Sequence, residues 1–122
     1  MRLFIAIEIP EDIKEYLTSI QEKIYMNSNK IRFVKKEQIH LTLKFLGEVQ
    51  PNIADEIKDN LKRINFNPFS VVLDNLGIFP NEGYIKVIWV GLKPEKPILE
   101  LQKGIDESLR KLFKKEKNFK AH

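Results

Sequence analysis

The stretch Gln38-Ile39-His40-Leu41-Thr42-Leu43-Lys44-Phe45-Leu46-Gly47 decides how the rest of the sequence is interpreted. Apolar and polar residues alternate along it, which is typical of a half-buried β-strand that ends at a glycine. Side chains at positions i and i+2 of a strand point to the same face, so His40 and Thr42 are expected side by side. The opposite face is expected to point into a core and carries Leu41, Leu43 and Phe45.

An imidazole beside a hydroxyl on a rigid strand suits acid–base chemistry on an oxyanion such as phosphate, because imidazole titrates near neutral pH. Lys44 continues the face of His40 and Thr42 and is expected to add positive charge near that phosphate. The alternatives are a histidine that only packs, a threonine that serves as a strand former and a solvated lysine at a strand end. The chain has one other histidine, His122, which is its last residue.

The composition fits an ordinary soluble globular protein. A chain of 122 residues allows one domain, residues 1–122, with a modest core. The hydrophobic fraction is 43% and the charged fraction 31%, which argues against disorder. The net charge of +4 is compatible with a polyanionic substrate and also common among soluble proteins. Much of the excess lies in residues 110–117, which fit either a charged helix C-terminus or a nucleic-acid contact.

Several classes of protein are disfavoured. The absence of cysteine excludes disulfides and thiolate metal sites, and two histidines are few for zinc, so we expect neither a metal nor a cofactor. No apolar run approaches the length of a membrane span, so no membrane association is expected. The apolar start, residues 1–8, is too short for a signal peptide and is interpreted as a first buried strand. We therefore expect a cytoplasmic location.

The pattern along the chain predicts the element order β-α-β-β-α-β-β-α-β, which defines an α+β protein. Helices are expected to begin near Pro10, Pro51 and Pro97, where proline is tolerated in the first turn, and the last should run to about Lys115. The first helix has an apolar stripe at helical spacing, formed by Ile13, Tyr16, Leu17, Ile20 and Ile24. Further strands are expected at residues 31–34, 69–73, 85–90 and from 118 onward, with a loop at 77–83.

Four blocks of sequence resemble a known family. They are RLFIAI at 2–7, HLTLKFLGE at 40–48, LGIFP at 76–80 and VIWVGL at 87–92. In this order and spacing they resemble the RNA 2′,3′-cyclic phosphodiesterases, also called 2′-5′ RNA ligases, of the two-histidine phosphoesterase superfamily. The resemblance covers essentially the whole chain. One His-x-Thr would be weak evidence, but four blocks in register are specific.

The family carries two His-x-Thr motifs. The second histidine corresponds to His122, which follows His40 by 122 − 40 = 82 residues. Because the sequence stops at His122, it resembles the first two-thirds of a family member, C-terminally truncated at the second motif. A complete protein is expected to be a monomer. A strand-swapped dimer is the alternative for a chain that leaves sheet edges unpaired.

The resemblance implies a bilobal fold, in which antiparallel sheets flanked by helices form a central cleft and each sheet presents one motif. One of His40 and His122 would act as general base and the other as general acid, in an order that the sequence leaves open. The threonine hydroxyl of Thr42 would hold phosphate oxygens. The implied reaction is metal-independent hydrolysis of RNA 2′,3′-cyclic phosphate to a 2′-phosphate, with 2′-5′ ligation as the related transfer.

Two aromatic residues have more than one interpretation. Phe79 would stack on a base of bound RNA or anchor its loop to the core, and Trp89 is expected in the core. A non-catalytic RNA- or nucleotide-binding module is an alternative function, since one His-x-Thr can hold a phosphate without supplying both acid and base. An inactive fragment is a further alternative.

Overall fold

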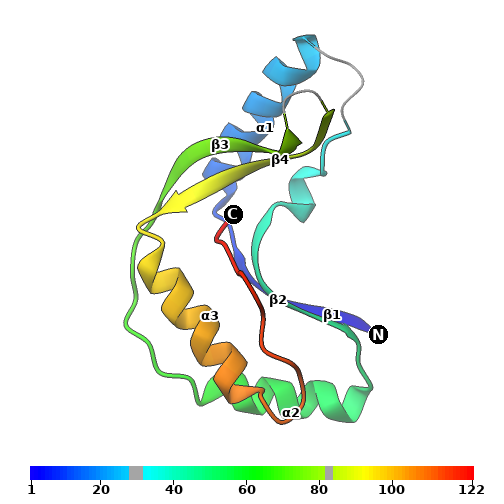
Figure 1. Cartoon of the computed structure of the whole chain (residues 1–122), viewed down its shortest axis with the longest axis vertical. Coiled ribbons are helices and arrows are strands. Elements are labelled where there is room, and N and C mark those ends of the chain that lie inside the picture. Colours follow the sequence, from blue (N-terminus) through cyan, green and yellow to red (C-terminus); the bar gives the residue numbers. More distant parts are fainter. Residues whose placement is uncertain (28–31, 82–83) are drawn as a thin grey trace. The chain divides into compact units, whose positions relative to one another are not determined.

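The structure, a computed structural model, describes residues 1–27, 32–81 and 84–122 (Figure 1). The elements in chain order are β1 (Arg2–Glu8), α1 (Glu11–Asn27), the 3₁₀ turn η1 (Lys36–Gln38), β2 (His40–Glu48), α2 (Pro51–Lys62), β3 (Val72–Asn81), β4 (Tyr84–Lys93) and α3 (Lys96–Ser108). Strands β1 and β2 form one two-stranded sheet, and β3 and β4 form another, which is antiparallel. The α+β class is confirmed.

The chain folds as two compact units. The large unit comprises Met1–Ile5 and Thr42–His122, and the small unit comprises Ala6–Leu41. The boundary therefore crosses both β1 and β2. His40 belongs to the small unit, while Thr42 and His122 belong to the large one.

The small unit is built around α1, which begins directly after Pro10. Its first turn carries Glu11 and Asp12, where negative charge is favourable to the helix dipole. Lys36 of η1 binds back to this helix, with its Nζ 2.6 Å from Glu11 Oε1 and 3.5 Å from Glu15 Oε1. The ion pairs tie the segment after the helix to its N-terminal half.

Two predictions for the small unit were wrong. Tyr16 is exposed, whereas the other four residues of the predicted apolar stripe are half-buried. Residues 32–34 of the predicted strand at 31–34 are irregular, and residue 31 lies outside the described residues. Apolar character alone had suggested a strand there, but Val34 is exposed and has no core to enter.

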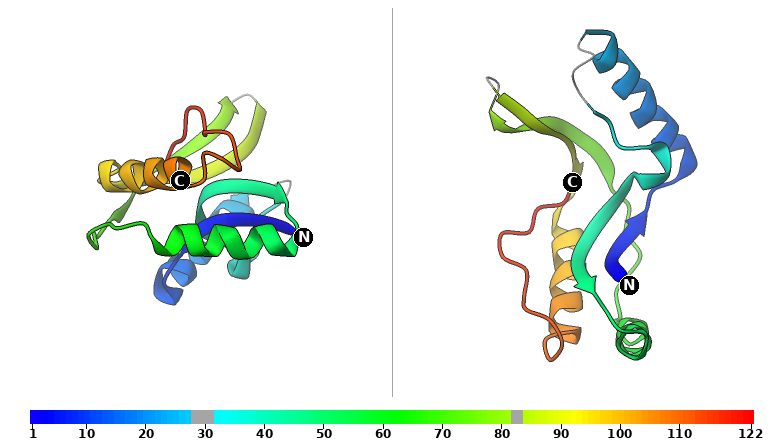
Figure 2. Two further views of the ribbon diagram at one scale, coloured as in Figure 1. Left: turned by 90° about the horizontal axis from the view of Figure 1, so that it is seen from below. Right: turned by 90° about the vertical axis from the view of Figure 1, so that its right-hand side faces the viewer.

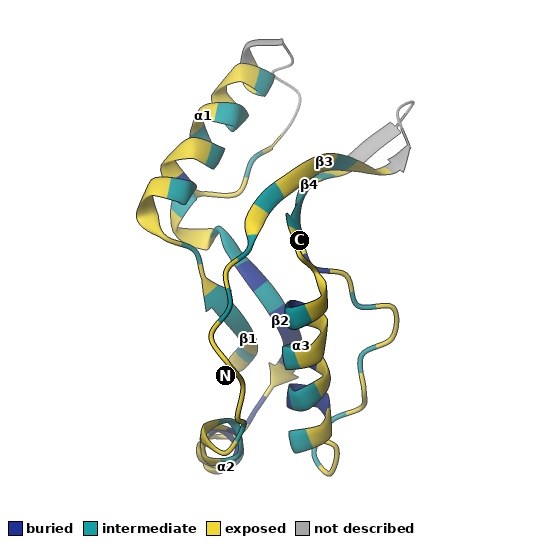
Figure 3. Ribbon diagram, turned by 90° about the vertical axis from the view of Figure 1, so that its left-hand side faces the viewer, coloured by how far each residue is buried: buried dark blue, intermediate teal, exposed yellow. Residues whose placement is uncertain are grey.

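The core of the large unit gathers on β2, α2 and α3, as the dark blue segments of Figure 3 show. Ile98 and Leu109 are fully buried, and Ile57 of α2 is nearly so. The buried apolar residues of this unit are Leu43, Leu46, Val49, Ala54, Ile57, Ile98, Ile105, Leu109 and Ala121. Ala121 lies next to His122, so the core holds the backbone immediately before the second histidine.

The β3–β4 hairpin is longer than predicted. Residues 77–81 of the predicted loop are part of β3, and the predicted strand start at 69 lies at Val72 instead; residues 82 and 83 lie outside the described residues. The register pairs Leu76 with Val90, Gly77 with Trp89 and Phe79 with Val87, and it shifts between Phe79 and Pro80. A glycine and a proline suggested a turn, but a strand accepts proline at an irregularity, where no ladder donor is required.

Helix α3 is shorter than predicted, since it ends at Ser108 and the next residues form turns. The amides of Leu112 and Phe113 both donate to the carbonyl of Leu109, which is fully buried. Residues 114–122, all within the described part of the chain, form neither helix nor strand, so the strand predicted from 118 onward was wrong. This C-terminal segment runs back alongside α3 (Figure 2).

No helix in the described ranges is long and apolar enough to cross a membrane.

Candidate functional site

The predicted strand around His40 is confirmed, because β2 begins at His40 and runs to Glu48. His40 and Thr42 are both half-buried strand residues. They lie two positions apart in one strand, where side chains alternate between faces. The local sequence therefore forms the element that the His-x-Thr pattern required.

The apolar face of β2 differs from the prediction at one position. Leu41 and Leu43 are buried, but Phe45 is 72% exposed, so its predicted place in the core was wrong. Its ring instead lies 5.9 Å from that of Phe4 on β1. The strand continues beyond the packed core on this face, while the other face buries Lys44 and Leu46.

Lys44 forms a buried ion pair rather than an open cationic site. Its Nζ lies 2.5 Å from Asp106 Oδ1 and donates to the carbonyl of Lys114 at 2.6 Å. The side chains of Lys44 and Asp106 are 2% and 4% exposed. Two of the three ammonium protons are thus used internally, and the predicted place of Lys44 beside a substrate phosphate is corrected to a structural one.

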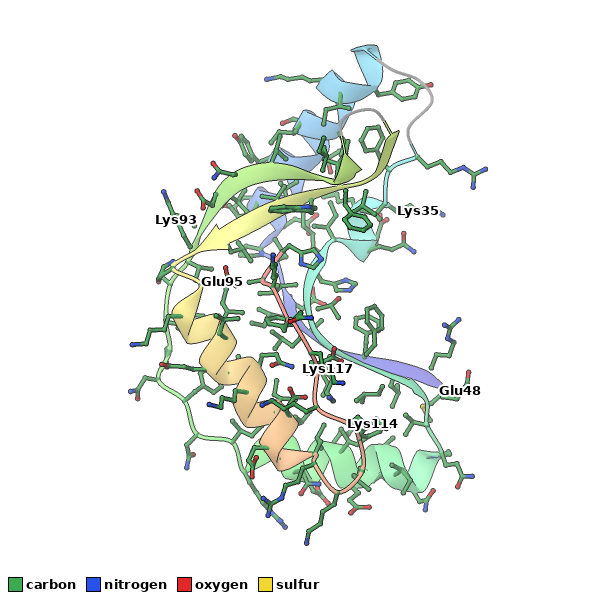
Figure 4. All side chains as sticks on the ribbon, viewed as in Figure 1. Lys35, Glu48, Lys93, Glu95, Lys114 and Lys117 are labelled. Carbon is green, nitrogen blue, oxygen red and sulfur yellow. The ribbon has the colours of Figure 1, made fainter. Side chains whose placement is uncertain are left out.

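Asp106 joins three segments of the large unit. Its Oδ2 accepts hydrogen bonds from Gln102 Nε2 at 3.0 Å and from the amide of Glu116 at 3.2 Å. Gln102 Nε2 also donates to the carbonyl of Leu43 at 3.4 Å. Strand β2, helix α3 and residues 114–116 are therefore connected through one carboxylate. Figure 4 labels Lys114 and Lys117 on that C-terminal segment.

Asp106 and Gln102 are not singled out by any motif in the sequence. Their signal was their position, since both lie on the side of the predicted third helix that carries Ile98, Ile105 and Leu109. An amide and a carboxylate at i and i+4 on an apolar face must find buried partners, because an unpaired buried polar group is costly. The sequence alone does not indicate which residues bind these two side chains.

His122 is exposed at its ring but held in two ways. Its Nδ1 lies 2.8 Å from the carbonyl oxygen of Lys120, and its ring centroid lies 6.4 Å from that of Trp89, with the ring planes at 66°. A carbonyl oxygen can only accept, so Nδ1 is the donor and the neutral ring keeps its lone pair on Nε2. Nε2 is therefore the ring nitrogen that this hydrogen bond leaves uncommitted.

Trp89 and Phe79 lie on one face of the β3–β4 hairpin, because Gly77 faces Trp89 and Phe79 faces Val87 across the strands. Trp89 is 37% exposed, so its predicted place in the core was wrong; the indole covers Gly77 and meets His122 instead. Phe79 is 59% exposed and belongs to a strand. The alternative in which Phe79 anchors a loop to the core does not fit this exposure.

In the part of the chain that the structure describes, no group of three or more histidine, aspartate or glutamate side chains is arranged to hold a metal ion.

Glu11 and Lys36 of the small unit shift each other's pKa. Lys36 holds the pKa of the Glu11 carboxyl below its usual value by hydrogen bonding and by its charge. The hydrogen bond to the carboxylate in turn raises the pKa of Lys36.

Comparison with known proteins agrees with the sequence blocks. The family of LigT-like phosphoesterases matches residues 7–89. The chain is 45% identical to an RNA 2′,3′-cyclic phosphodiesterase of Methanocaldococcus jannaschii, over all of this chain and 68% of that protein. It is 37% identical to the Archaeoglobus fulgidus enzyme of the same name, over all of this chain and 69% of that protein.

Solved structures show the same fold. Escherichia coli LigT complexed with 3′-AMP superimposes with a TM-score of 0.84 and 27% identity, covering 99% of this chain and 68% of that one. The Thermus thermophilus protein TT0787 superimposes with a TM-score of 0.83 and 30% identity, covering all of this chain and 71% of that one. This chain belongs to the LigT-like phosphoesterases, and the family resemblance of the four blocks is confirmed.

Proposed function

We propose that this chain is an RNA 2′,3′-cyclic phosphodiesterase that forms a 2′-phosphate, with His40 and His122 as its acid–base pair. The observation that carries the proposal is the histidine and threonine on one strand, β2, in a chain of this family. The relatives named RNA 2′,3′-cyclic phosphodiesterase support the same reaction. The cleft in which the two histidines would meet stays a prediction.

The reaction needs two proton transfers and no redox step. The general base takes a proton from water as the water oxygen attacks phosphorus. The bond between phosphorus and O3′ breaks, and the general acid gives a proton to O3′, which leaves a 2′-phosphate and a 3′-hydroxyl. Nε2 of His122 suits either role, because Nδ1 is already bound to the carbonyl of Lys120. A 5′-hydroxyl in place of water would turn the same transfer into 2′-5′ ligation.

Two other residues contribute to binding in this proposal. The Thr42 hydroxyl donates to a phosphate oxygen, since it shares the strand of His40. The exposed ring of Phe79 stacks on a base, as aromatic side chains do at single-stranded RNA sites. The similarity to LigT, whose solved structures include complexes with 3′-AMP and ATP, supports a nucleotide-containing ligand.

The test is turnover of an oligoribonucleotide 2′,3′-cyclic phosphate in EDTA, with the product identified by ³¹P NMR. We expect a 2′-phosphate, and a loss of about 10²–10⁴-fold in His40→Ala, the range for one positioned proton-transfer group. Thr42→Val should weaken turnover, whereas Thr18→Val should not. Thr18 is the matched control because its hydroxyl donates to the carbonyl of Lys14 within α1.

Two other outcomes separate the alternatives. Tight binding of the cyclic phosphate without turnover would favour the non-catalytic RNA- or nucleotide-binding module. Turnover that survives His40→Ala unchanged would reject the two-histidine mechanism.

A further inference from the structure

Trp89 and Gly77 form a contact that the acid–base mechanism does not use. They face each other across the β3–β4 hairpin, and the indole also meets the imidazole of His122. We propose that Trp89 is a positioning residue: seated on Gly77, its indole holds the His122 ring so that Nε2 keeps one direction. The catalytic consequence of this inference rests on the proposed function, but the contact itself can be tested without it.

The indole of Trp89 can approach the backbone of β3 because residue 77 has no side chain. A Cβ atom built on Gly77 would lie 2.0 Å from Cζ2 of Trp89 and 2.2 Å from Cε2, far inside van der Waals contact. The six-membered ring of the indole therefore lies directly on the bare backbone of β3. Any larger residue at position 77 must push the ring away from its present place.

The indole supplies a restraint that the C-terminal segment lacks on its own. Residues 114–122 belong to no helix or strand of the described chain, so no backbone ladder orients His122. Ala121 anchors the backbone by its burial, and the bond from Nδ1 to the carbonyl of Lys120 holds one edge of the ring. The edge-to-face contact at 6.4 Å and 66° lies within the favourable range for aromatic pairs and restrains the ring plane.

The exposure of Trp89 agrees with this role. A tryptophan that served only to fill the core would be largely buried, yet 37% of Trp89 is exposed, and its ring lies against Gly77 and pairs with the imidazole of His122. If Trp89 is removed, the imidazole keeps its backbone hydrogen bond but can tilt about it. Nε2 would then lie in the required direction for only part of the time.

The first test observes the His122 ring by NMR in the chain of residues 1–122. Only two histidines are present, so His40→Gln identifies the signals of His122. We expect Gly77→Ala and Trp89→Leu to shift the His122 ring signals toward those of free histidine, and Trp89→Phe to shift them less. Gly91→Ala is the matched control, because its Cβ would lie 3.5 Å from Cζ3 of Trp89, an ordinary contact.

The second test measures hydrolysis of the cyclic phosphate by the same variants. We expect kcat to fall about 10–100-fold in Gly77→Ala and Trp89→Leu with little change in KM, because small misplacements of a reacting group are costly. Trp89→Phe should recover part of kcat. Circular dichroism checks that each variant folds. If Trp89→Leu does not fold, Gly77→Ala still tests the contact.

The outcomes distinguish this inference from the proposed function. If the His122 signals do not move in folded Gly77→Ala and Trp89→Leu, the positioning contact is wrong, whatever the activity. If the signals move but kcat does not, the contact exists and its catalytic role is rejected, while the proposed function stands. If the unmodified chain shows no turnover, the proposed function fails, and the NMR arm still decides whether Trp89 orients His122.

Discussion

The ammonium of Lys44 and the carboxylate of Asp106 form an ion pair of 2.5 Å in the interior of the large unit. The two residues are 62 positions apart in the sequence, on β2 and α3. Each charge is also bound by neutral partners, the carbonyl of Lys114 for the lysine and the side chain of Gln102 for the aspartate. Such a pair tolerates loss of both charges better than loss of one, because a single buried charge left behind has neither water nor an opposite charge beside it.

Removing one partner of this pair should therefore be strongly destabilising. We expect Lys44→Met or Asp106→Leu to lower the free energy of unfolding by about 3–5 kcal/mol. The double variant should recover most of the loss, since two apolar side chains can replace a buried ion pair at little cost. Urea denaturation measures all three. The matched control is Lys93→Met, which removes the exposed pair with Asp74 at 3.7 Å and should cost only about 0–1 kcal/mol.

If the two single variants and the double variant all lose the same free energy of unfolding, the two side chains are not a coupled pair. That result would mean that each side chain acts through its own packing.

The carboxylate of Asp106 should also order the C-terminal segment. In Asp106→Ala we expect the amide of Glu116 to exchange with deuterium faster than in the unmodified chain, because that amide donates to Asp106 Oδ2. The amide of Leu109 serves as an internal reference, since it donates to the carbonyl of Ile105. Unchanged protection of Glu116 would show that other contacts hold the segment.

The Glu11–Lys36 pair predicts a small dependence of stability on acid pH. Lys36 lowers the pKa of Glu11 in the folded state. The contribution to stability is thus fully present above the unfolded-state pKa of Glu11 and is lost as the pH falls through its lowered folded-state pKa. NMR titration of the Glu11 carboxyl should show its pKa return toward the usual value in Lys36→Gln.

Lys35→Gln is the control for that titration, because it removes the same charge one residue away. A Glu11 pKa that responds equally to both variants would indicate a general charge effect in place of the pair.

Because the ring of Phe45 is exposed, we expect this strand position to tolerate substitution unusually well. We expect Phe45→Ser to cost less than about 1.5 kcal/mol, the upper value for one aromatic pair, since the ring contacts Phe4 but remains 72% exposed. Leu43→Ala, two residues earlier and buried, should cost about 2–5 kcal/mol. Urea denaturation and sedimentation velocity should be measured together.

A large loss in Phe45→Ser that depends on protein concentration would show that a second copy covers this face. That result would favour the strand-swapped dimer over the monomer.

Local patterns in the sequence determined where most of the helices and strands begin and which residues share a strand. The alternation around His40 predicts β2 because a strand has a period of two, and the prolines mark the starts of α1, α2 and α3 because only a first turn accepts them without loss. The same local reading placed His40 and Thr42 on one strand. The four blocks then indicated the family, which the comparison confirms.

Only the tertiary structure decided what each side chain meets. Alternation put Lys44 on the face of Thr42, but its burial depends on Asp106, which lies far away in the sequence. It likewise put Phe45 in line with Leu43, although the core ends between them. Trp89 was expected in the core and instead lies on Gly77 beside His122. Periodicity reports the face of an element, whereas burial and pairing depend on which distant segment covers that face, and no local pattern contains that information.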